Sequence, residues 1–100
     1  MIRTLVINPG AEDDIADAYR WYEARARGLG SRLLGELDAT FERIVAHPHS
    51  YSEVEAGIRK SLVHTFPYLV FYTVDERSVF VLAVIHAAQD PAYISERLGA

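Results

Sequence analysis

Seven consecutive apolar residues, Val79 to Ile85, constrain the fold of this chain more than any other feature. A strand with one face in water alternates apolar and polar residues, whereas this run contains no polar residue. The run is also much shorter than the about 20 apolar residues that cross a bilayer as a helix. It therefore predicts a strand in the middle of a sheet or one covered on both faces.

Other segments have the composition of strands that pair with this one. Tyr68 to Val74 precedes it, and the turn-forming residues 75–78 between the two predict a hairpin. Ile58 to His64 and the N-terminal Ile2 to Ile7 are also rich in β-branched and apolar residues. Residues 48–57 are polar, and we expect a loop there.

Two amphipathic helices are predicted between the first strand and the others. Asn8-Pro9 supplies an N-cap residue followed by proline at the first helical position, and Ser31 is the expected cap of the second helix. Apolar residues recur at helical spacing in both segments: Ala11, Ile15, Ala18 and Tyr22 in the first, Leu34, Leu37, Phe41 and Ile44 in the second. His47-Pro48 ends the second helix, and Asp90-Pro91 begins a short terminal helix through Leu98.

These elements predict an α+β fold with the order β-α-α-β-β-β-α. A helical hairpin packs on a small, mainly antiparallel sheet, and residues 1–100 form a single domain. The chain contains no cysteine, which excludes disulfides and thiolate metal sites and is compatible with a reducing cytoplasm. Without a signal peptide or a membrane-spanning run, we expect a soluble, cytoplasmic protein.

The charge of the chain argues against broad binding to nucleic acid. The formal net charge is −4, and sequence-independent binding grows with the number of phosphates that basic residues neutralise. Basic residues do cluster at the end of the first helix and the turn that follows: Arg20, Arg25, Arg27 and Arg32. They either oppose the negative end of a helix dipole or form a docking patch for an acidic partner segment. The acidic residues at positions 12–17 suit the positive end of the same helix.

Few residues suggest catalysis or metal binding. His86 ends the longest strand and is either a general acid or base or a hydrogen-bonded structural residue. Arg59 alternates with Ile58 and Lys60, so we expect it to point away from the helices. His47 and His49 lack a third ligand nearby in sequence, and we predict neither a metal nor a cofactor.

Aromatic residues on the second long strand divide between the two faces of the sheet. Tyr68 and Tyr72 share one face and Phe71 lies on the other. One of the two sets is expected to be partly exposed, where it can stack on a base or on a partner's side chain.

The order of these features resembles the RelE/ParE toxin superfamily. In the second half the resemblance rests on Ile58-Arg59, Leu62, Phe66-Pro67-Tyr68, Tyr72, Val79 to Ile85, His86, Asp90-Pro91 and Arg97. In the first half it rests on the helix Ala11 to Tyr22, which ends in Trp21-Tyr22, and on Ile44 to Pro48. The resemblance covers nearly the whole chain, and its strength lies in the ordered combination, since no single piece is specific.

The resemblance implies a toxin of a type II toxin–antitoxin module that maintains a plasmid or chromosome. A cognate antitoxin would wrap the toxin surface and silence it in a hetero-oligomer. We name Arg20, Arg25, Arg27, Arg32, Tyr68, Tyr72 and Arg97 as candidate partner-binding residues. The ParE-like branch of the superfamily poisons DNA gyrase, whereas the RelE-like branch cuts messenger RNA on the ribosome.

Three functional hypotheses follow from the resemblance. The first is a ParE-like toxin that binds a cellular target such as DNA gyrase. The second is a metal-independent endoribonuclease, in which Arg59 contacts phosphate and His86 moves a proton. The family often carries basic residues after that histidine, but this chain has Ala87-Ala88-Gln89, which disfavours the second hypothesis. The third is a homologue that binds an antitoxin without being toxic.

Overall fold

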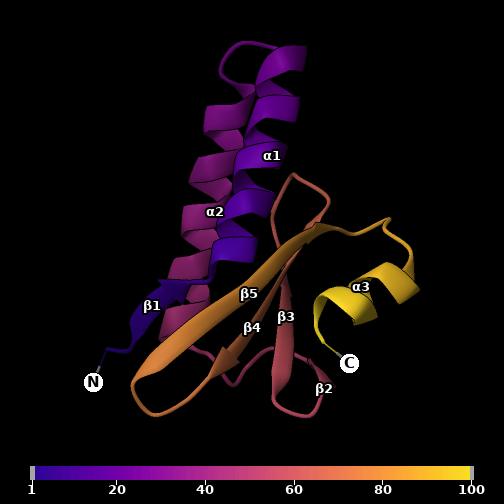
Figure 1. Cartoon of the computed structure of the whole chain (residues 1–100). Helices are drawn as coiled ribbons and strands as arrows, with labels where there is room; N and C mark the ends of the chain where they lie inside the picture. The colour runs from indigo at the N-terminus through magenta and orange to yellow at the C-terminus, as the bar shows by residue number, and fades with distance from the viewer. Residues whose placement is uncertain (1, 100) are drawn as a thin grey trace.

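A computed structural model describes residues 2–99 and contains three helices and a five-stranded sheet (Figure 1). The elements in chain order are β1 (Thr4–Ile7), α1 (Pro9–Arg25), α2 (Leu29–Ala46), β2 (Glu53–Glu55), β3 (Ile58–Leu62), β4 (Tyr68–Val74), β5 (Ser78–His86) and α3 (Pro91–Arg97). The α+β architecture predicted from the sequence is confirmed. The one addition is β2, which lies inside the segment expected to be a loop and pairs with β3.

The sheet has the order β1-β5-β4-β3-β2, so the longest strand lies inside it. β1 runs parallel to β5, and the remaining neighbours are antiparallel. β1 can be parallel because the α1–α2 hairpin and later strands intervene before β5, whereas β4 and β5 form a direct hairpin. The two helices lie side by side, and the turn between them is at the end of the hairpin far from the sheet (Figure 1).

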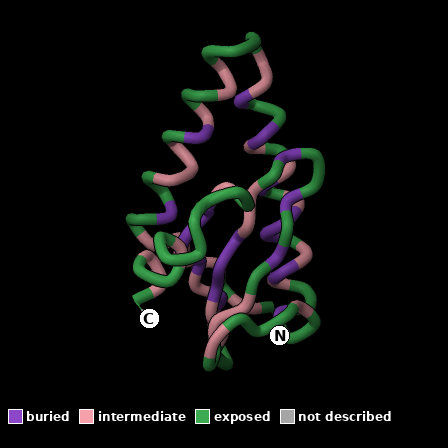
Figure 2. Tube along the Cα trace, turned by 90° about the vertical axis from the view of Figure 1, so that its right-hand side faces the viewer, coloured by how far each residue is buried: buried purple, intermediate pink, exposed green. Residues whose placement is uncertain are grey.

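β5 has apolar side chains on both faces of the sheet, and a β-bulge changes which face the residues after it take. The pairing shifts between Phe71 and Tyr72, which leaves Leu82 as the extra residue of β5. Val79 and Val81 pack in the large core under α1 and α2, as does Val84 after the bulge. Ala83 and Ile85 join a second core on the other face, where Ile94 and Leu98 pack against it. The uninterrupted apolar run is therefore explained by two cores, and Figure 2 shows the strands buried along their middle.

The turn between α1 and α2 is held by a carboxylate from the first helix. The two carboxylate oxygens of Glu23 accept hydrogen bonds from the main-chain N–H groups of Gly28 and Gly30, at 2.9 Å and 2.9 Å. The expectation that Ser31 caps α2 is wrong, because the helix begins at Leu29 and Gly28 is its N-cap with φ of 86°. Glu23 supplies the acceptor that a capping side chain would otherwise provide.

α1 and α3 begin at Pro9 and Pro91, where the sequence predicts helix starts. Asn8 precedes α1, although its side chain makes no capping hydrogen bond. The Asp90 side chain does cap α3, accepting from the N–H of Ala92 at 2.8 Å. Within residues 2–99, no helix is both long enough and apolar enough to cross a membrane.

Two helical glycines in α2 should respond oppositely to substitution by alanine. A Cβ at Gly30 would lie 2.8 Å from the Tyr19 ring and from its carbonyl oxygen, whereas a Cβ at Gly35 would meet nothing within 4 Å. We expect Gly30→Ala to lower the free energy of unfolding by about 1–3 kcal/mol through overpacking. Gly35→Ala should raise it by about 0.5–1 kcal/mol, because alanine favours the helix. Urea denaturation of the two variants measures both values, and equal effects would contradict the close packing of the hairpin.

Candidate functional site

A cleft of about 430 Å³ lies between α1, the end of β5 and α3. Its walls combine aromatic, acidic and basic side chains from all three elements. The lining residues are Asp14, Asp17, Ala18, Trp21, Tyr22, Tyr68, Val84, Ile85, His86, Gln89, Tyr93 and Arg97. Three residues named from the sequence, Tyr68, His86 and Arg97, are thus brought together.

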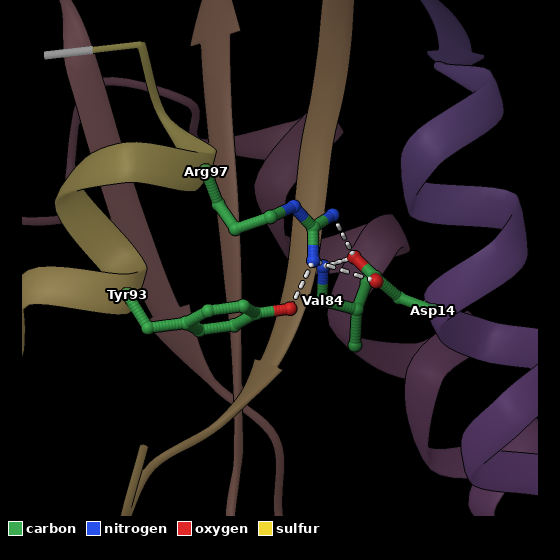
Figure 3. Close-up of polar contacts among 4 residues, drawn as sticks. All are labelled: Asp14, Val84, Tyr93 and Arg97. Carbon is green, nitrogen blue, oxygen red and sulfur yellow. Dashed lines mark hydrogen bonds and ion pairs between the residues drawn. The ribbon is translucent and has the colours of Figure 1, made fainter. Parts of the chain in front are cut away.

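The carboxylate of Asp14 joins α1, β5 and α3 (Figure 3). Its two oxygens accept hydrogen bonds from the two terminal nitrogens of Arg97, at 2.9 Å and 2.7 Å. One of them also accepts from the main-chain N–H of Val84 at 3.0 Å. The pair is shielded, since the side chains of Arg97 and Asp14 are 25 % and 15 % exposed. The hydrogen bond to Asp14 raises the pKa of Arg97, so its charge is fixed at any accessible pH.

Arg97 is therefore committed within the chain. It also donates to the Tyr93 hydroxyl oxygen at 3.0 Å, which lies on the same helix (Figure 3). Ile94 and Leu98 pack against Phe71, Ala83 and Ile85, and no residue of α3 is buried. We therefore expect the Asp14–Arg97 pair to contribute, together with this packing, to holding α3 on the sheet. Its place in the partner-binding set named from the sequence remains a prediction.

Sequence reasoning misses the role of Asp14, although a signal exists. From the sequence, the acidic residues at positions 12–17 are explained only by their favourable interaction with the positive end of the helix dipole. However, Asp14 follows Ala11 by three residues and precedes Ala18 by four, and both alanines are buried. Residues at these spacings share one helix face, so Asp14 belongs to the face that packs on the sheet.

Tyr68 and His86 face each other across β4 and β5 at the end of the sheet. They are paired in the strand register, and their rings meet edge to face with centroids 5.2 Å apart. Tyr22 lies edge to face with both Phe66 and Tyr68. Burial, and secondarily Tyr22, raises the pKa of Tyr68, which keeps its phenol neutral at physiological pH.

His86 has one ring nitrogen occupied by the main chain. Its Nδ1 accepts a hydrogen bond from the N–H of Ala88 at 3.0 Å. In the neutral ring the proton is then on Nε2, which makes His86 a hydrogen-bond donor through that atom. This arrangement matches the structural interpretation of His86 and leaves one nitrogen for a ligand in the cleft.

Arg59 lies elsewhere, and the expected direction of its side chain is wrong. Arg59 pairs with Tyr72 in the β3–β4 register, so both project to the face that carries α1 and α2. Its guanidinium donates to the carbonyl oxygen of Tyr51 at 2.7 Å and lies 3.6 Å from Glu53. The prediction fails because Ile58 packs in the second core, on the opposite face.

Arg59 and His86 are not brought into one site. They pair with Tyr72 and Tyr68, which are four residues apart on β4 and hence separated by about 13 Å along the strand. Arg59 does not line the cleft that contains His86.

Tyr72 does not belong to the surface. It shares a face with Tyr68 as predicted, but its side chain is 0 % exposed, because this is the face covered by the helical hairpin. Its hydroxyl donates to the carbonyl oxygen of Pro48 at 2.6 Å. Burial raises the pKa of Tyr72 to about 12, despite the lowering effect of Arg59. Its predicted contact with a partner is corrected to a structural role.

The arginines around the hairpin turn are exposed, and an aromatic residue lies among them. Arg20 forms an ion pair with Asp17, one turn earlier in α1. The guanidinium carbon of Arg25 lies 3.6 Å from the ring centroid of Trp21, which is 50 % exposed. Arg27 is exposed in the turn itself, and Arg32 is exposed in the first turn of α2. We call Trp21, Arg25, Arg27 and Arg32 the hairpin patch; the sequence pattern indicates its arginines but not Trp21.

The two loop histidines lie apart from this site. His47 and His49 are exposed, and among residues 2–99 no group of three or more His, Asp or Glu side chains is arranged to hold a metal ion.

Removing the Asp14 carboxylate should loosen α3. In Asp14→Ala, Arg97 and the Val84 N–H lose their acceptor, and we expect the free energy of unfolding to fall by about 2–4 kcal/mol. Asp17→Ala is the matched control, because it deletes an exposed carboxylate whose ion pair is worth about 0–1 kcal/mol. Urea denaturation combined with hydrogen exchange of residues 91–97 distinguishes the two. Equal stability of both variants and unchanged exchange in α3 would show that the pair does not hold the helix.

Comparison of this geometry with solved structures places the fold. The chain from the chromosomal ParDE toxin–antitoxin system of P. aeruginosa superposes with a TM-score of 0.74 at 13 % identity, over 85 % of this chain and 96 % of that one. A double mutant of the E. coli toxin RelE in the free state gives 0.64 at 19 % identity, over 99 % and 97 % of the two chains. At these identities the similarity establishes the shared fold.

Sequence comparison identifies the family. Toxin ParE2 of Mycobacterium tuberculosis, found in two strains, is 29 % identical over 92 residues, which cover 91 % of this chain and 88 % of the relative. The sequence model of the ParE toxin of type II toxin–antitoxin systems, parDE, matches residues 5–91. The resemblance noted from the sequence is thereby confirmed, and the chain belongs to the ParE toxin family of type II toxin–antitoxin systems.

Proposed function

We propose that this protein is a toxin that arrests growth by binding a cellular target such as DNA gyrase, and that a cognate antitoxin neutralises it in a hetero-oligomer. Membership of the ParE family supports the toxin role. The similar P. aeruginosa chain comes from a chromosomal ParDE toxin–antitoxin system. Since such a system pairs a toxin with an antitoxin, this similarity supports the antitoxin partner.

We prefer binding over catalysis because the guanidinium of Arg97 in the cleft is already engaged within the chain. Among residues 2–99, Arg97 is the one arginine or lysine that lines the cleft around His86, and its guanidinium is engaged by Asp14 and Tyr93. With Asp14 and Asp17 also present, the formal charge of the lining is −1, taking His86 as neutral. A site that transfers phosphoryl groups needs preorganised positive groups for the charge that develops in the transition state. Among the described residues of the cleft, the one arginine is already paired with a carboxylate, so the lining offers no unpaired arginine or lysine for that charge.

The ribonuclease hypothesis is weakened by the same geometry. It assigns the phosphate contact to Arg59 and the proton transfer to His86, and these residues lie at separate places on the sheet. The guanidinium of Arg59 is also engaged by contacts to Tyr51 and Glu53 within the chain. A non-toxic homologue that binds an antitoxin retains all the surface features described and differs only in having no target.

Inducing the chain alone in cells tests these hypotheses together. We expect growth arrest, relaxed or broken DNA and intact transcripts, with growth restored when the antitoxin is co-expressed. Arrest should persist in His86→Ala and in Arg59→Ala, and immunoblots must show equal protein levels. Transcript cleavage that disappears in either variant would overturn the proposal in favour of the ribonuclease. Absence of arrest at a confirmed protein level would leave the non-toxic homologue.

The hairpin patch should contribute to antitoxin binding through charge. Reversing two exposed arginines in Arg27→Glu with Arg32→Glu should weaken the complex by about tenfold or more at low salt, and less at high salt. The double variant Lys60→Glu with Arg77→Glu is the control, since both residues are exposed and the change in net charge is the same. Calorimetric titration against the antitoxin measures the affinities. Equal affinities for both double variants would exclude the patch.

A further inference from the structure

The two edges of the sheet differ in how they are protected. β2, at one edge, has three residues, an irregular register and two carboxylates, Glu53 and Glu55. Short length, charge and bulges are the features that keep an edge strand from pairing with another chain. β1, at the opposite edge, has the sequence Thr-Leu-Val-Ile and regular pairing with β5. One edge of the sheet is therefore protected and the other is not.

The register of β1 directs main-chain groups outward from this edge. The N–H of Thr4 donates to Arg77 and the N–H of Asn8 donates to Val81, so these groups point toward β5. Main-chain direction alternates along a strand, and the N–H and C=O groups of Leu5 and Ile7 consequently point away from β5. A strand laid beside β1 would find donors and acceptors at both residues.

A groove of about 620 Å³ runs along the same edge, between β1 and α2. Leu5, Phe41 and Val45 line it with apolar surface, and Asp38 and Glu42 contribute exposed carboxylates. Arg3 of the same chain also lines the groove, and its Nε donates to the carbonyl oxygen of Asp75 at 2.7 Å. Ile2, also a lining residue, is 89 % exposed. With one arginine and two carboxylates, the lining has a formal charge of −1. An occupant that fits therefore supplies apolar side chains on one face and one further basic group for the carboxylates.

The first strand of a second copy supplies this chemistry. Arg3, Leu5 and Ile7 are two residues apart and thus share one face, on which Leu5 and Ile7 contact the helix core. A copy of this strand added to the sheet presents its arginine and its two apolar side chains on the face where the groove lies. Because the arrangement is two-fold, each copy receives from the other what it provides.

We infer that the free protein forms a two-fold dimer in which the β1 strands of two copies pair antiparallel and Arg3 of each enters the Asp38–Glu42 side of the other's groove. With Leu5 opposite Leu5, the outward groups of both strands are paired. Each Arg3 then lies beside Ile7 of the other copy. The two sheets become continuous, and the exposed Ile2 side chains gain neighbours.

Reversal of the paired charges tests the interface. Sedimentation velocity of the purified protein from micromolar to several hundred micromolar should show a monomer–dimer equilibrium. Arg3→Glu and Asp38→Arg should each weaken the dimer by roughly tenfold or more, because like charges then face each other. The double variant with both changes should restore it. Asp13→Arg is the control: it makes the same charge change as Asp38→Arg at an exposed residue outside the groove.

Circular dichroism of each variant establishes that it is folded. A protein that stays monomeric at every concentration, or a dimer that responds no more to Arg3→Glu and Asp38→Arg than to the control, overturns the inference. Weakening by both single variants without recovery in the double variant also overturns the charge pairing.

The register of the paired strands has a test of its own. Leu5→Cys introduces the chain's first cysteine at the residue that meets its own copy across the two-fold axis. Directly opposite residues of antiparallel strands have Cα atoms about 5.5 Å apart, which a disulfide can bridge. Under mild oxidation we expect a cross-linked dimer that mass spectrometry identifies. A folded Leu5→Cys variant that dimerises but forms no cross-link overturns this register.

Discussion

The carboxylate of Asp14 fixes the relative positions of three elements that lie far apart in the sequence. β1 pairs with β5 only as far as Val81, and beyond that point the Val84 N–H has no neighbouring strand on that side. Asp14 accepts this hydrogen bond from α1 and at the same time binds Arg97 of α3. One carboxylate thus satisfies a main-chain N–H at the sheet edge and links the first helix to the last, and it lies in the wall of the cleft.

The order of the elements follows from local signals in the sequence. Asn8-Pro9 and Asp90-Pro91 mark helix starts because proline suits the first helical position, and the structure has helices at both places. Tyr68 to Val74 is observed with the predicted bounds. Local signals fail where a distant residue supplies the contact. Ser31 is the cap that the local sequence predicts for α2, but Glu23 reaches forward from α1 and satisfies the main-chain N–H groups of the turn.

The direction of side chains is harder to predict because the sheet has two cores. An apolar residue such as Ile58 is expected to face the helical hairpin. However, α3 covers the other face of the sheet, and Ile58 packs in the core on that face. Because Ile58 and Arg59 alternate between faces, assigning Ile58 to the hairpin face places Arg59 on the face opposite to the observed one. The bulge at Leu82 adds to the difficulty, since it exchanges the faces of the residues that follow it on β5. Alternation defines which residues share a face, but identifying that face requires knowing what packs on each side.

The engagement of Arg59 and Arg97 within the chain supports the proposed binding role on a fold that is shared with RelE. Arg59 donates to main-chain carbonyl oxygens of the loop between α2 and β2, and Arg97 is bound to Asp14. Both guanidinium groups thus have terminal nitrogens engaged by contacts within the chain. Apart from Arg77 in the β4–β5 turn, the exposed arginines among residues 2–99 lie toward the hairpin turn, near Trp21, where a protein partner has access. Chemistry on this scaffold thus depends on which arginines the fold engages, and here it engages Arg97 in the cleft and Arg59 on β3.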